Sequence, residues 1–118
     1  MTGGGCTSGD LFFGLPAAPM DQGAEEQVLA LVARPGVRVE RIVSTGQASP
    51  PGYWYDQAED EFVVLLAGEA LLTIEGRPEP LRLTPGTWVD LPARCRHRIE
   101  WTQADPPTVW LAVFTGRG

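Results

Sequence analysis

Two segments of the chain carry side chains that could take part in acid–base or metal chemistry. The first, residues 55–68, contains the phenol Tyr55, the amide Gln57 and the carboxylate Glu61. The second, residues 86–101, contains His97, which is the only histidine in the chain. Because Tyr55 and Gln57 lie two residues apart, they share a face if this stretch is extended. The four groups can act together only if the fold brings both segments to one place.

Other reactive side chains near these segments each have a structural explanation as well. An acidic cluster either supplies a carboxylate to a site or forms a solvated loop: Asp56, Glu59 and Asp60. Cys95 shares strand parity with His97, but no third group that would orient a reactive pair is evident, which favours an inert thiol. Three arginines either bind an anion or pair with acids: Arg94, Arg96 and Arg98. The tryptophans are typical of a core or an interface, and one or two could line a pocket: Trp54, Trp88, Trp101 and Trp110.

Composition restricts the class of protein. A chain of 118 residues is long enough for one packed domain. It contains no apolar run near the roughly 18 residues that cross a bilayer, and its start lacks the features of a secretory signal. We therefore expect a cytoplasmic protein with no membrane partner. The net charge of −6 argues against nucleic acid as a partner, because phosphate binding needs a positive surface.

Turn residues spread between apolar runs predict an all-β domain of many short strands. We expect a flexible tail over residues 1–10, an N-terminal segment with one short helix over 11–36, and a β-barrel domain over 37–118. The helix is predicted because apolar residues recur at helical spacing between 24 and 33, before Pro35-Gly36. Strands are predicted over 37–44, 62–67, 70–74, 78–83, 88–91, 97–101 and 108–114. Such a series is typical of a double-sheet jelly roll.

The two segments resemble the two sequence motifs of the cupin superfamily. The first cupin motif reads H-x-H, three residues, E, six residues, G, and Glu61 and Gly68 stand in register with it. The second reads G, five residues, P-x-G, two residues, H, three residues, N, and Gly86, Pro92 and His97 stand in register. Four motif positions carry other residues, namely Tyr55 and Gln57 for the two histidines, Arg94 for the glycine and Trp101 for the asparagine.

The resemblance covers roughly residues 37–114 and is greatest to small single-domain bacterial cupins. Strings typical of that group stand here as Arg41–Ser44, Ser49–Gln57 and Asp60–Ala70. The resemblance implies a double-stranded β-helix, the jelly-roll barrel of cupins. It does not select one activity, because this fold supports many unrelated functions.

By position, the resemblance implies that Tyr55, Gln57, Glu61 and His97 face the barrel interior as ligands of one divalent metal ion (Zn, Mn, Ni or Fe). Glu61 and Tyr55 would then be the groups available for proton transfer. Two functions remain open: a metal-assisted enzyme acting on a small organic acid or carbonyl compound, and a non-catalytic module that binds or senses a small molecule without a metal. The habit of the family also implies a homodimer.

Overall fold

The computed structural model describes residues 5–16 and 25–116. Within these ranges the regular elements are all strands: β1 (Gln27–Arg34), β2 (Val37–Ser44), β3 (Asp60–Ala67), β4 (Ala70–Ile74), β5 (Leu81–Leu83), β6 (Trp88–Leu91), β7 (His97–Thr102) and β8 (Thr108–Thr115). In the same ranges no helix is long and apolar enough to cross a membrane. The predicted flexible tail is described only from Gly5 onward, so its first four residues lie outside the described part.

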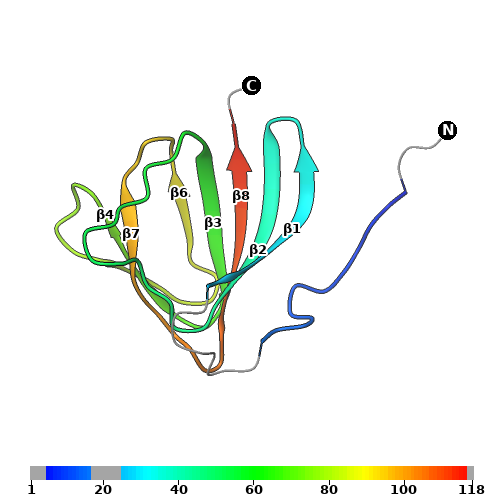
Figure 1. Cartoon of the computed structure of the whole chain (residues 1–118), viewed down its shortest axis with the longest axis horizontal. Coiled ribbons are helices and arrows are strands. Elements are labelled where there is room, and N and C mark those ends of the chain that lie inside the picture. The colour runs from blue at the N-terminus through cyan, green and yellow to red at the C-terminus, as the bar shows by residue number, and fades with distance from the viewer. Residues whose placement is uncertain (1–4, 17–24, 117–118) are drawn as a thin grey trace.

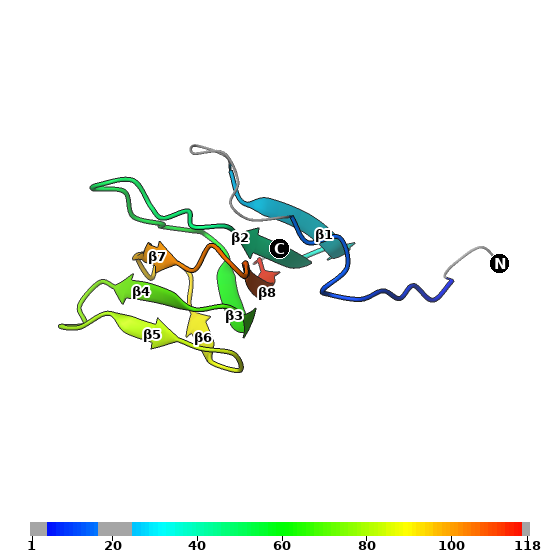
Figure 2. The same cartoon turned by 90° about the horizontal axis from the view of Figure 1, so that it is seen from below.

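The strands form two antiparallel sheets (Figures 1 and 2). The larger sheet has the order β1-β2-β8-β3-β6 and the smaller has the order β5-β4-β7. Apolar side chains between the sheets form one core, in which Leu65, Leu83 and Ala112 are fully buried. The all-β, two-sheet jelly roll predicted from the sequence is therefore confirmed.

The short helix predicted over residues 24–33 is wrong, because residues 27–34 form the edge strand β1. Residue 24 itself lies outside the described part. β1 pairs antiparallel with β2, and Arg34 faces Val37 across a tight turn made by Pro35 and Gly36. Gly36 has a φ of 75°, which suits the third position of a Pro-Gly turn. A ten-residue helix is marginal in water. A strand in the same place forms backbone hydrogen bonds with the edge of β2 along its length.

The segment before β1 is attached to the barrel by Arg41. This side chain is 5% exposed, although it belongs to a residue type that is rarely buried. Its guanidinium donates to the carbonyl oxygens of Phe13, at 2.5 Å, and Leu11, at 3.3 Å. The segment around Leu11 thus lies against the large sheet.

Candidate functional site

A cavity of about 110 Å³ opens between the two sheets. Its apolar walls come from both sheets: Ile42, Val63, Leu72, Leu91, Ile99, Trp110 and Phe114. Its polar groups are Glu26, Tyr55, Gln57, Glu61 and His97. The structure therefore brings all four sequence-predicted residues into one cavity and adds Glu26.

Backbone bonds hold the first motif along β7. Tyr55 and His97 form an isolated antiparallel bridge, with N–O distances of 2.7 and 3.1 Å. Their rings stack with centroids 5.2 Å apart. The Arg94 amide also donates to the Gln57 carbonyl oxygen at 2.7 Å. The two motifs are thus joined by main-chain contacts, which fix how their side chains enter the cavity.

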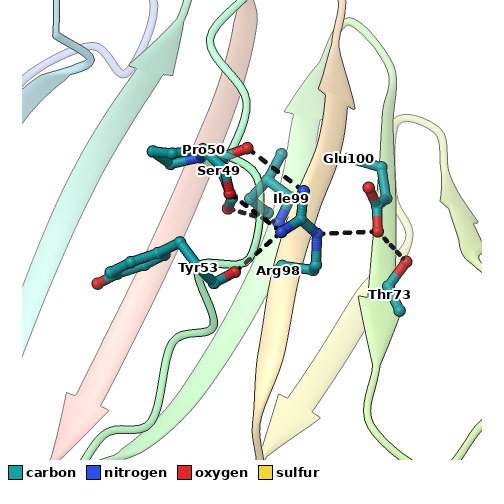
Figure 3. A network of polar contacts seen from close by, with 7 residues as sticks. All are labelled: Ser49, Pro50, Tyr53, Thr73, Arg98, Ile99 and Glu100. Carbon is teal, nitrogen blue, oxygen red and sulfur yellow. Dashed lines mark hydrogen bonds and ion pairs between the residues drawn. The ribbon is translucent and has the colours of Figure 1, made fainter.

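Arg98 secures the loop that precedes Tyr55 (Figure 3). Its guanidinium donates to the carbonyl oxygens of Pro50 and Tyr53, both at 3.1 Å, and its Nε donates to Glu100 at 3.1 Å. Ser49 adds a hydroxyl that accepts from the Ile99 amide at 2.9 Å. Because β7 also carries His97, this network sets the position of Tyr55 relative to the imidazole.

His97 and Glu61 face each other inside the cavity. The Nδ1 atom of His97 lies 2.9 Å from the Cys95 carbonyl oxygen, so Nδ1 carries the proton and donates it. The unprotonated Nε2 lies 3.9 Å from Oε1 of Glu61. The same Oε1 accepts from Nε2 of Gln57 at 3.2 Å. His97 and Glu61 are 5% and 8% exposed, so they meet in a site nearly free of bulk water.

Burial favours the uncharged forms of the titratable side chains in the cavity. It raises the pKa of Glu61, although the hydrogen bond from Gln57 opposes the shift. It also raises the pKa of Tyr55, with the nearby Glu26 carboxylate acting in the same direction. Burial lowers the pKa of His97. The site therefore holds a neutral imidazole and an intact phenol beside a carboxyl group whose pKa is shifted toward neutrality, as acid–base catalysis requires.

The donor set only partly suits the divalent metal that the fold implies. Glu61 and His97 supply two strong ligands, and the free Nε2 lone pair with Nδ1 bonded to a carbonyl is the form in which histidine binds metals. Catalytic sites generally use three strong protein ligands. In residues 5–16 and 25–116 no group of three or more His, Cys, Asp and Glu side chains is arranged to hold an ion. The donor set therefore falls short of a resident catalytic metal.

The acidic, arginine and cysteine side chains also considered from the sequence lie outside the cavity lining. The acidic loop is used structurally: Asp56 pairs with Arg94 at 3.4 Å, Glu59 with Arg38 at 2.9 Å, and Asp60 accepts from the Ala93 amide at 2.7 Å. Arg96 pairs with Glu75 and Arg98 with Glu100. Cys95 packs against the core as a free thiol. Among the tryptophans, Trp110 lines the cavity.

Glu26 was missed as a site residue by the sequence reasoning. It precedes β1, and its carboxylate accepts from the hydroxyl of Ser44, whose oxygen accepts from Nε1 of Trp110 at 3.0 Å. In the sequence Glu25 and Glu26 look alike, as acids suited to the first turn of a helix. Only the pairing of β1 with β2 turns Glu26 inward.

The comparisons with known proteins agree with the observed fold. A profile of the Cupin domain family matches residues 40–114. The chain therefore belongs to the cupin family. No curated protein matches it.

Several solved structures share the fold. A protein of Ralstonia eutropha JMP134, provisionally named a mannose-6-phosphate isomerase, is 44% identical, with a TM-score of 0.87 and coverage of 94% of this chain and 99% of that one. A cupin superfamily protein of Desulfitobacterium hafniense DCB-2 is 17% identical, with a TM-score of 0.66 over 84% of each chain. An RmlC-like cupin of Methanocaldococcus jannaschii is 22% identical, with a TM-score of 0.60 over 83% of this chain and 86% of that one. The last two support the fold alone.

Proposed function

We propose that this cupin is a proton-transfer enzyme of the isomerase type, acting on a small carbonyl compound in the barrel cavity. The observation that carries the proposal is the buried Glu61 carboxyl facing the neutral His97 imidazole at 3.9 Å. Glu61 would take a proton from the hydroxyl-bearing carbon next to the carbonyl and deliver it to the former carbonyl carbon, while the hydroxyl proton passes to the former carbonyl oxygen. The Tyr55 hydroxyl, whose pKa is raised, stays protonated and can donate to the carbonyl oxygen.

The name of the 44% identical Ralstonia protein supports an isomerase. From that name we adopt the reaction type and not the sugar phosphate. Glu61 and Tyr55 would act without a metal, because the donor set among the described residues offers only two strong ligands and a catalytic metal generally has three.

Deuterium uptake tests the proposal without knowledge of the product. The protein is incubated in D2O with a panel of small hydroxy- and aminocarbonyl compounds, and proton NMR follows loss of the C–H signal next to the carbonyl. We expect exchange with the wild type and a loss of about 10²- to 10⁴-fold in Glu61→Gln. The matched control is Glu79→Gln, which changes an exposed glutamate outside the cavity lining. Equal exchange by wild type and Glu61→Gln, or no exchange with any compound, contradicts the proposal.

Two other measurements would favour the alternatives left open by the sequence. Compounds that raise the melting temperature without any exchange would indicate a binding or sensing module. A divalent ion is favoured by the free Nε2 of His97. Elemental analysis of protein purified without an affinity tag tests it: near-stoichiometric metal that disappears in both Glu61→Ala and His97→Ala would establish a metal site.

The homodimer implied by the family is also part of this proposal. Phe62 and Trp88 are 41% and 62% exposed on the outer face of the large sheet, where their rings stack 5.6 Å apart. Exposed apolar patches of this kind mark interaction sites. Light scattering should give twice the chain mass for the wild type and a lower mass for Trp88→Glu. Trp101→Glu is the control, since Trp101 is 43% exposed but lies on β7 of the other sheet. A monomeric wild type contradicts the dimer.

A further inference from the structure

The charges that line the cavity are of one sign. Two carboxyl groups, those of Glu26 and Glu61, contribute to the lining. The chain contains no lysine, and none of the arginines within residues 5–16 and 25–116 lines the cavity. Arg38 lies beside the lining, over the Phe114 ring at 4.2 Å, and its charge opposes the rise that burial causes in the pKa of Glu61. Its guanidinium, however, is already paired with Glu40 and Glu59 at 2.8 and 2.9 Å. His97 stays neutral because burial lowers its pKa.

Burial raises the pKa of Glu26 and of Glu61, and one hydrogen bond from the framework to each carboxyl group opposes that shift. The Ser44 oxygen accepts the indole proton of Trp110, so the Ser44 hydroxyl is left to donate to Glu26. Gln57 donates from Nε2 to Glu61. A donor aimed at a carboxyl group favours its ionised form. The two groups also sense each other's charge, since Glu26 helps to raise the pKa of Glu61. The described cavity lining places no positive side chain between the two carboxyl groups.

The rest of the cavity suits a short hydrocarbon body. Ile42, Leu72 and Ile99 give aliphatic walls, and Trp110 gives an aromatic one. The volume of about 110 Å³ is below the roughly 150 Å³ of an apolar cavity that accommodates benzene. A ligand of about four to six non-hydrogen atoms therefore fits, and an aromatic wall beside a cation adds further attraction.

We propose that the cavity selects a small organic cation, such as a primary ammonium compound, with its positive group between Glu26 and Glu61 and its hydrocarbon part on the apolar wall. This inference rests on the proposed function and names its substrate class: a small aminocarbonyl compound. A ligand whose only charge is a carboxylate or phosphate would meet two carboxyl groups and no opposing cation in the described lining.

Three size-matched probes test the inference on the intact protein: n-butylammonium, 1-butanol and n-butyrate, by isothermal calorimetry at pH 7. We expect n-butylammonium to bind at least 10-fold more tightly than 1-butanol, and n-butyrate to bind more weakly than both. Binding of n-butyrate or 1-butanol as tight as that of n-butylammonium overturns the inference, as does no binding of n-butylammonium.

Glu26→Gln keeps the shape of the side chain and removes its charge. It should reduce the preference for n-butylammonium over 1-butanol at least 10-fold. Glu25→Gln is the matched control, because Glu25 is the exposed neighbour outside the cavity lining and should leave the preference unchanged. An unchanged preference in a Glu26→Gln protein with wild-type circular dichroism also overturns the inference.

The failure of this inference can be told apart from failure of the proposed function. If neutral hydroxycarbonyl compounds exchange deuterium through Glu61 while n-butylammonium does not bind, the enzyme stands and the cation preference falls. If n-butylammonium binds through Glu26 while no carbonyl compound exchanges, the cation site stands and the enzyme falls.

Discussion

Gly68→Ala is expected to destabilise the protein by about 3 kcal/mol or more, because it combines backbone strain with a clash. Gly68 has a φ of 83°, in the left-handed region where a side chain is strained. A Cβ there would lie 2.6 Å from the Cα and Oγ1 atoms of Thr108. Thr108 is fully buried in β8, and its hydroxyl donates to the Gln103 carbonyl oxygen at 2.8 Å, so it has no room to move.

Gly76→Ala separates the two causes. Gly76 has a φ of 91°, similar to that of Gly68, but an added Cβ would find no atom within 4 Å. We expect this variant to lose only the cost of backbone strain, about 1–2 kcal/mol. Chemical denaturation of the wild type and the two variants measures the difference. Equal losses in both variants would show that the close approach of β8 is not what restricts Gly68.

Glu61→Gln is expected to make the protein more stable at pH 7 and to change its stability little at pH 4. Burial raises the pKa of Glu61 in the folded state above its unfolded value. The folded protein therefore holds this proton more tightly than the unfolded chain does. The stability contributed by the proton is fully present below the unfolded pKa, about 4.3, and is lost as the pH rises through the folded pKa.

The gain at pH 7 should be on the order of 1–3 kcal/mol, the cost of burying an incompletely satisfied polar group. Glu40 and Glu26 raise the pKa of Glu61 further, while Arg38 and Gln57 oppose them. His97 changes stability with pH in the opposite direction, because burial lowers its pKa. The quantity to measure is therefore the difference in free energy of unfolding between Glu61→Gln and the wild type at each pH. Urea titrations at pH 4, 5.5 and 7 measure it, with Glu79→Gln as the control. A Glu61→Gln protein less stable than wild type at pH 7 would show that the Glu61 carboxylate is well solvated or paired.

The motif spacing indicated which side chains share one cavity, because it records backbone constraints as well as ligands. Arg94 illustrates this: it occupies the glycine position of the second motif, and its φ of 67° is the only positive value of a non-glycine residue in the described part. Residue 94 keeps the left-handed backbone conformation although arginine replaces the glycine that favours it. Tyr55 and Gln57 likewise keep the histidine positions and enter the cavity with different chemistry.

What the sequence could not predict depends on pairing between distant strands. The apolar residues of β1 fit a helical period equally well, and only the free edge of β2 selects a strand. The same pairing brings Glu26 into contact with Ser44. On β2 the alternation of polar and apolar residues was visible, but it could not reveal that Arg38 lies over the Phe114 ring at 4.2 Å, on the core side. In a barrel whose inner face carries polar side chains, hydropathy alone does not tell the two faces apart.

The guanidinium of Arg41 attaches the segment around Leu11 and Phe13 to the barrel. Its Nη1 atom donates to two carbonyl oxygens of a segment that precedes the first strand, and its Nε has no hydrogen-bond partner among the described residues. Shortening the protein to start after Phe13 would leave this cation buried without either acceptor. Trimming the protein to the strands alone would therefore remove part of what holds the large sheet.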